Sequence, residues 1–103
     1  MSDELRRAAE EHFERGNTFD ENGYRERAVA EWQEAVHLDP DHQAAHYNLG
    51  IAYADEGEYK LAESELREAI RLDPFDIDAR RELAEIFWSK RALTMQSTNY
   101  AKS

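Results

Sequence analysis

Two histidines on one expected helix are the residues whose type and spacing could bind a metal. His42 and His46 are four positions apart, so both imidazoles lie on one face of a helix and could reach one zinc ion. A stable site needs further ligands, and the sequence offers no third ligand at a matching spacing and no Cys. We therefore predict no metal and no other cofactor.

The motifs of the common enzyme classes are absent from the sequence. It has no Gly-rich phosphate loop, no nucleophile elbow and no helix-borne metalloprotease motif. Carboxylates are abundant, but they are spread as on any acidic helical surface, and no pattern assigns one of them to a secluded pocket. We predict that the chain is not an enzyme.

The charge balance limits the partners. The sequence has 13 Lys and Arg against 23 Asp and Glu, a net charge of −10. This charge opposes binding to a phosphate backbone or an anionic membrane surface, so we predict no nucleic acid and no membrane as partner. A peptide with basic and apolar residues is compatible with it. The longest apolar-rich stretch, residues 49–54, is too short to span a bilayer. The N-terminus lacks the apolar run of a signal peptide. We therefore expect cytoplasmic residence.

An internal repeat organises the chain. Residues 34–40 (EAVHLDP) recur as residues 68–74 (EAIRLDP), displaced by 34 positions, with five of seven residues identical. The same displacement relates Gly16 to Gly50 and Gly23 to Gly57. A fixed period of this length is typical of proteins built from repeated structural units.

Helical periodicity and turn signals predict five helices and no strand, an all-α fold. Asn22-Gly23 and Gly57 suit helix C-termini, and Pro40 and Pro74 stop the second and fourth helices. In the fourth helix we expect Leu61 to point inward. The expected helices cover about 3–22, 25–38, 42–56, 59–72 and 77–91. We expect Ser2 or Asp3 to cap the first helix, Asp41 the third and Asp76 the fifth. Residues 92–103 are expected to form a disordered tail.

These residues resemble the tetratricopeptide repeat family. The second unit carries the family pattern as His46-x2-Leu49-Gly50-x2-Tyr53, Ala62-x3-Leu66, Ala69 and Pro74, and the first as His12-x2-Arg15-Gly16-x2-Phe19, Ala28-x3-Trp32, Ala35 and Pro40. His12 and His46 stand where the family packs an aromatic residue, which favours a packing role over a metal site. The resemblance implies an α-solenoid of antiparallel helix pairs: one domain over 1–91, with units at about 9–42 and 43–76 and a capping helix at 77–91.

In this family the first helix of each unit lines a concave groove that holds a peptide. The resemblance therefore implies a non-enzymatic scaffold for protein–protein interaction. Phe13 and Tyr47 occupy equivalent positions and are expected to stack along the groove, unless they are packing residues beside a solvated acidic face. By the shared register, we expect the groove to be lined by Phe13, Asn17, Asp20, Tyr47, Asn48, Ile51, Asp55, Arg81, Glu85 and Trp88, with Glu21, Asp78 and Glu82 on the same side.

Some family members bind acidic C-termini of chaperones through two Asn and several Lys or Arg. Asn17 and Asn48 match the two Asn positions, but Phe13, Asp78 and Glu82 stand at cationic ones. Two reversed charges would repel a carboxylate, so an acidic peptide is disfavoured.

The alternative function is structural: a self-association module that stacks through its C-terminal helix, giving a weak homodimer. Parts of Leu83, Ile86, Phe87 and Leu93 lack cover if the tail does not fold back. Uncovered ends of repeat arrays associate readily. On this reading Ile86→Glu would dissolve the dimer.

Overall fold

Antiparallel helix pairs follow one another along the chain, as the repeat predicts. The computed structural model describes residues 2–102, and the side chains of these residues as far as Arg91. The described chain contains helices and no strand, which confirms the all-α prediction. The helices are α1 (Asp3–Glu21), α2 (Arg25–Leu38), α3 (Gln43–Asp55), α4 (Tyr59–Leu72) and α5 (Ile77–Lys102).

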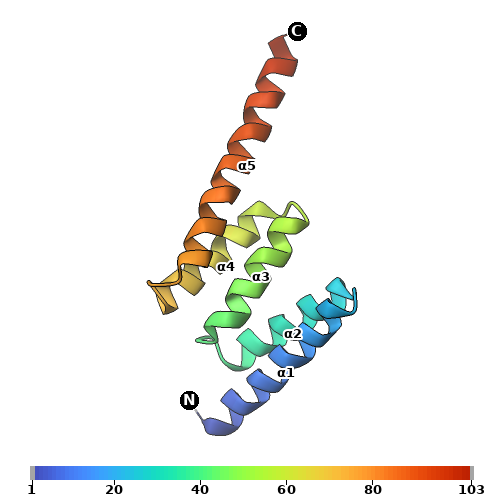
Figure 1. The fold of residues 1–103 in the computed structure, drawn as a ribbon, viewed down its shortest axis with the longest axis vertical. Helices are drawn as coiled ribbons and strands as arrows, with labels where there is room; N and C mark the ends of the chain where they lie inside the picture. The colour runs from blue at the N-terminus through green and yellow to red at the C-terminus, as the bar shows by residue number, and fades with distance from the viewer. Residues whose placement is uncertain (1, 103) are drawn as a thin grey trace.

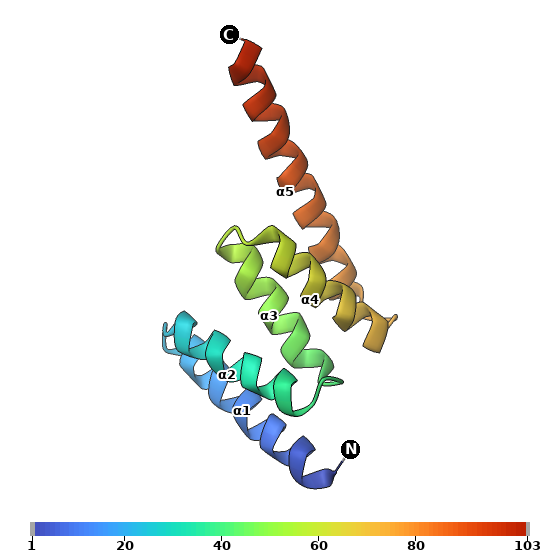
Figure 2. The same cartoon turned by 180° about the vertical axis from the view of Figure 1, so that it is seen from behind.

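The helices stack in the order of the sequence. The hairpin of α1 and α2 is followed by the hairpin of α3 and α4, and α5 lies at the end of the stack, with its C-terminal part projecting beyond it (Figure 1). The reverse view places α4 between α3 and α5 (Figure 2). The molecule is elongated, 58 × 30 × 19 Å, as expected when each unit packs only on its neighbours.

Local signals set most helix ends. The side chain of Ser2 accepts a hydrogen bond from the Leu5 amide and begins α1, and Asp76 does the same for the Ala79 amide at α5. The predicted bounds of α2 and α4 are confirmed. The prediction that Asp41 caps α3 is wrong: Nδ1 of His42 accepts the hydrogen bond from the Ala45 amide, 3.2 Å away.

The core forms where the two helices of a unit approach most closely. A Cβ atom built on Gly16 would lie 2.6 Å from Nε1 of Trp32, and one built on Gly50 would lie 2.6 Å from Cγ of Leu66. Glycine therefore lets α2 pack on α1 and α4 pack on α3. Leu61, predicted to point inward, is 49% exposed instead, because it lies outside the stripe of α4 that contains Ala62, Leu66 and Ala69.

The last helix is longer than predicted. The backbone of α5 remains helical to Lys102 instead of ending near Arg91. The two earlier hairpins turn at Gly23 and Gly57, whose φ angles of +86° and +80° are in the left-handed region. Arg91 stands 34 residues after Gly57, and no Gly or Pro follows it, so no local signal stops the helix. The side chains of the predicted tail, residues 92–103, lie outside the described part of the chain.

Candidate binding site

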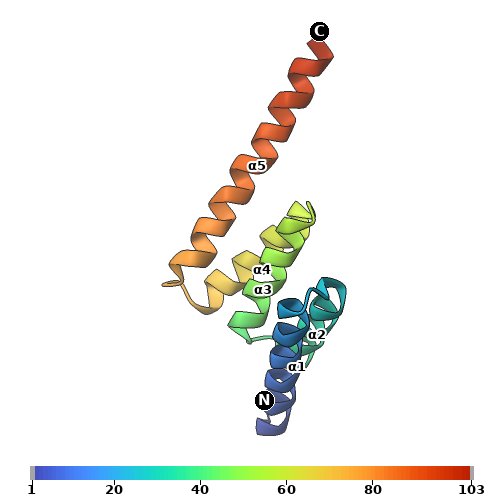
Figure 3. The same ribbon diagram turned by 45° about the vertical axis from the view of Figure 1, so that its right-hand side comes forward.

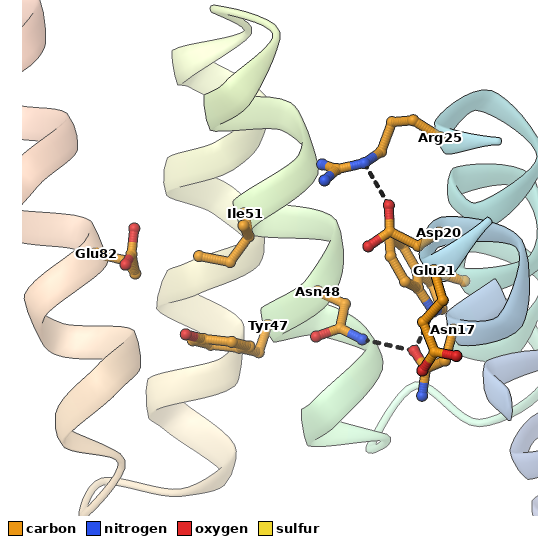
Figure 4. A pocket seen from close by; sticks show the side chains of 9 residues that line it. Asn17, Asp20, Glu21, Arg25, Tyr47, Asn48, Ile51 and Glu82 are labelled. Atoms are coloured by element: carbon orange, nitrogen blue, oxygen red, sulfur yellow. Dashed lines mark hydrogen bonds and ion pairs between the residues drawn. The ribbon is translucent and has the colours of Figure 1, made fainter. Parts of the chain in front are cut away.

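A pocket of about 310 Å³ opens between α1, the start of α2, α3 and α5 (Figure 4). We call it the groove pocket. The predicted groove residues that line it are Asn17, Asp20, Tyr47, Asn48 and Ile51, and Glu21, Arg25, Trp32 and Glu82 complete the lining. The structure therefore brings together residues from both units and from α5.

Two asparagines form the part of the groove pocket between α1 and α3. The side-chain oxygen of Asn17 accepts hydrogen bonds from Nδ2 of Asn48, at 3.0 Å, and from Nε1 of Trp32, at 3.1 Å. These bonds fix both amide groups. They leave the amide nitrogen of Asn17 and the carbonyl oxygen of Asn48 without a partner among the described residues. One donor and one acceptor so placed match the hydrogen-bonding groups of a peptide backbone.

The rest of the lining combines apolar surface with negative charge. Tyr47 and Ile51 extend from α3 toward Glu82 of α5 (Figure 4). Asp20 and Glu21 add two carboxylates on the side of α1. The only cation of the described lining, Arg25, is paired with Asp20 at 2.7 Å and with Asp55 at 3.3 Å. The pocket therefore presents a negative potential to a ligand.

The pKa values of two side chains of the groove pocket are raised. Burial raises the pKa of the Glu82 carboxyl, and the nearby carboxylates of Glu85, Asp55 and Asp78 raise it further. Burial also raises the pKa of the Tyr47 hydroxyl, with the carboxylate of Glu82 as the next cause. A cation placed between these groups would stabilise their charged forms.

Five predicted groove residues lie outside this pocket. Asp55 pairs with Arg25, and Arg81 pairs with Asp78 one helical turn away on α5. Glu85 and Trp88 are exposed on α5, where the Trp88 ring meets Phe87 edge to face, with 5.8 Å between centroids. Phe13 is half-buried against the core between α1, α2 and α3, and so has the packing role.

The predicted stacking of Phe13 on Tyr47 is wrong, because the ring of Phe13 contacts His42, with 4.7 Å between centroids. The physical reason is an axial offset between α1 and α3. Side chains that pair across these helices are 31 residues apart for Asn17 and Asn48, and 32 apart for Glu10 and His42. Both separations are shorter than the 34-residue repeat, so Phe13 lies beside the start of α3.

Sequence reasoning missed Arg25 and Trp32, which belong to α2. The shared register assigns only the first helix of each unit to the groove, and the family pattern has Trp32 in the second helix of the first unit. Trp32 is indeed buried, and only its ring nitrogen reaches Asn17. No sequence signal connects Arg25 with Asp55, because that ion pair joins two units.

His12 and His46 each connect the two helices of their unit. Nδ1 of His46 lies 2.8 Å from a Glu65 carboxylate oxygen, and Nε2 lies 2.7 Å from the carbonyl oxygen of Pro40. The first unit repeats the contact, with His12 and Glu31 at 2.6 Å. No cluster of three or more His, Cys, Asp or Glu suited to a metal occurs among the described residues. None of the described helices is both long and apolar enough to cross a membrane.

Comparisons with known proteins agree with this architecture. A family model described as "Tetratricopeptide repeat" matches residues 13–77 and 55–94. Two crystal structures of MamA superpose with a TM-score of 0.78 at 24% sequence identity, covering 92% of this chain. This chain spans about half of theirs, 55% in one and 51% in the other. At this identity the likeness shows the fold alone. A search of curated proteins found no match.

Proposed function

The chain belongs to the tetratricopeptide repeat family, and on this premise we propose that it binds a peptide with basic and apolar residues in the groove pocket. Membership of the family supports a protein–protein interaction scaffold, generally without enzymatic activity. The proposal adds where the partner binds and which chemistry it has.

The observation that carries the proposal is the hydrogen-bonded pair Asn17 and Asn48 within an acidic rim. Their remaining donor and acceptor would hold the backbone of an extended peptide. An apolar side chain of that peptide would pack on Ile51 and the Tyr47 ring, and a Lys or Arg would reach Glu82. An acidic peptide would meet the same carboxylates unpaired and be rejected.

The test is a screen of peptides that vary in charge and apolar content, followed by calorimetric titration of the best binder. The variants Glu21→Gln and Glu82→Gln each remove one charge from the pocket lining. Glu11→Gln and Glu34→Gln remove the same charge from exposed positions outside it and serve as matched controls.

We expect each pocket variant to weaken binding of a cationic peptide roughly three- to tenfold, and each control to leave it unchanged. Added salt should weaken binding to the native chain more than to the pocket variants. A screen that selects acidic peptides, or pocket variants and controls with equal effects, would contradict the proposal.

Self-association through α5 is the second candidate, because Phe87 and Trp88 are 56% and 64% exposed. From the sequence, Ile86→Glu is expected to dissolve such a dimer. This substitution is unsuitable as a test. Ile86 is 3% exposed and packs in the core with Ala62 and Leu66, so a charge there would unfold the end of the stack. Phe87→Glu places the charge on the exposed face instead.

A further inference from the structure

A second pocket, of about 350 Å³, lies on the outer side of α4 and α5. We call it the end pocket. Figure 3 shows α5 at the end of the stack, with no further described helix beside it. It is separate from the groove pocket, with which it shares no residue. Its lining consists of Glu63, Arg67 and Ile70 of α4 and Arg80, Leu83, Ala84 and Phe87 of α5.

The repeat shows what occupies the equivalent place in the preceding unit. Ala84 and Arg80 stand 34 residues after Gly50 and His46. On α3 this face is covered by α4: Leu66 packs over Gly50, and Glu65 pairs with His46 at 2.8 Å. The first unit agrees, because Trp32 of α2 packs over Gly16 and Glu31 pairs with His12 at 2.6 Å. The end pocket is therefore the place, equivalent to those of α2 and α4 in the earlier units, where a covering helix would pack on α5.

The two covering helices share a sequence pattern. Each has a small residue, a carboxylate three positions later, a large apolar residue directly after it, and a second small residue three positions further on. In α2 these are Ala28, Glu31, Trp32 and Ala35, and in α4 they are Ala62, Glu65, Leu66 and Ala69. The small residues are fully buried, so the pattern describes the face that a helix must present in order to pack in the end pocket.

The described chain does not supply a covering helix for α5. Arg91 replaces the glycine at which the two earlier hairpins turn, and the backbone continues as one helix to Lys102. Leu83 and Ala84 therefore remain more exposed than their equivalents Leu49 and Gly50, which are buried. None of the described helices therefore occupies the end pocket.

The charge of the end pocket indicates which side chains a helix bound there would carry. Arg80 takes the position that His12 and His46 hold in the earlier units, where the partner is a glutamate from the covering helix. The guanidinium of Arg80 has no side-chain partner among the described residues. Arg67 adds a second positive charge to the lining, and Glu63, the one acidic residue of the described lining, is paired with Lys90 at 2.8 Å. The end pocket therefore has a positive lining, although the molecule as a whole carries a charge of −10.

We propose that the end pocket binds an amphipathic helix of a partner protein, which completes the third unit in trans. The helix presents a carboxylate to Arg80 and the large apolar residue next to it to Ala84. This interaction does not depend on the proposed groove function, because it uses a different face of α5. Failure of either proposal leaves the other standing.

A segment of the chain itself can serve as a probe for the end pocket. A synthetic peptide of residues 58–73, with blocked termini, carries α4 and thus the covering pattern. We would titrate it into the ¹⁵N-labelled full chain and follow amide shifts. The expected result is saturable binding with the largest shifts at Leu83, Ala84 and Phe87. An absence of binding up to millimolar peptide would overturn the proposal.

Two variants test the geometry. Ala84→Trp fills the place where the apolar residue of the ligand would lie, and because Ala84 is exposed the variant should fold normally. Ala30→Trp makes the same change at an exposed alanine of α2 and is the matched control. We expect Ala84→Trp to weaken peptide binding at least tenfold and Ala30→Trp to leave it unchanged.

A charge swap tests the chemistry. Arg80→Glu in the chain, or Glu65→Arg in the peptide, should each weaken binding by roughly tenfold, and the two changes together should restore most of it. Additive losses without restoration would overturn the proposed ion pair.

The titration also separates the other occupants. If the peptide only exchanges with the α4 of the intact chain, Ala84→Trp would not weaken binding, and the proposal would fail. If sedimentation at the titration concentrations shows a dimer that Ala84→Trp dissolves, the occupant is a second copy and the proposal of a partner helix is wrong.

Discussion

At the scale of single residues, His46 shows how a polar group can replace an apolar one between two helices. Both ring nitrogens face acceptors, the Glu65 carboxylate and the Pro40 carbonyl, so only the doubly protonated ring satisfies both hydrogen bonds. Burial alone lowers the pKa of the imidazole, but these two hydrogen bonds and the charge of Glu65 outweigh burial, and the pKa is raised.

This raised pKa predicts a dependence of stability on pH. The stabilisation from His46 is fully present below the pKa of an unfolded histidine, about 6.5, and is lost as pH rises through the raised pKa of the folded protein. Thermal unfolding from about pH 5.5 to about pH 9, that is from about one unit below to about 2.5 units above the pKa of an unfolded histidine, measures it. His46→Phe should flatten this part of the profile.

His37→Phe is the control, because His37 is an exposed histidine of α2. It should leave the profile unchanged. If His46→Phe kept the native dependence on pH, the ion pair with Glu65 would not contribute to stability.

At the scale of elements, the close approach of α3 and α4 depends on the missing side chain of Gly50. Leu66 fills the space that a Cβ atom would occupy and is fully buried, so it cannot move aside easily. Overpacking of this kind displaces both helices.

We therefore predict that Gly50→Leu lowers the free energy of unfolding by about 1–3 kcal/mol, even though leucine favours helix. Ala84→Leu changes the equivalent position of α5, which is exposed, and should change stability by less than about 0.5 kcal/mol. Urea denaturation of both variants tests this contrast. Equal effects would mean that the helix contact at Gly50 is not the cause.

At the scale of the whole molecule, net charge opposes self-association while the exposed side of α5 favours it. A charge of −10 makes two copies repel each other at low salt. Phe87 and Trp88 provide apolar area for a weak contact once the repulsion is screened.

We expect sedimentation equilibrium to show a monomer at low salt and weak dimerisation only at high salt and high concentration. Phe87→Glu should abolish this dimerisation, whereas Tyr24→Glu, at an equally exposed residue at the start of α2, should not. A stable dimer at low salt would contradict this expectation.

The sequence by itself determined the repeat, the all-α fold and most helix boundaries. These features depend on signals within a few residues of one another: apolar positions at helical spacing, Ser2 and Asp76 as caps, and Gly23 and Gly57 at the turns. The resemblance carried by these residues also placed Asn17, Asn48 and Ile51 on the same side of the molecule, and the structure brings them together at one pocket.

Only the tertiary structure decided which side chains meet between units. The offset between α1 and α3 moves Phe13 to His42 and brings Arg25 to Asp55, and neither contact follows from the period of the repeat. The same holds for the end of the stack. Ala84 and Gly50 occupy equivalent positions in the repeat, but Gly50 is buried and Ala84 is exposed. The physical reason is that such contacts depend on how rigid helices pack across distances that no local sequence pattern encodes.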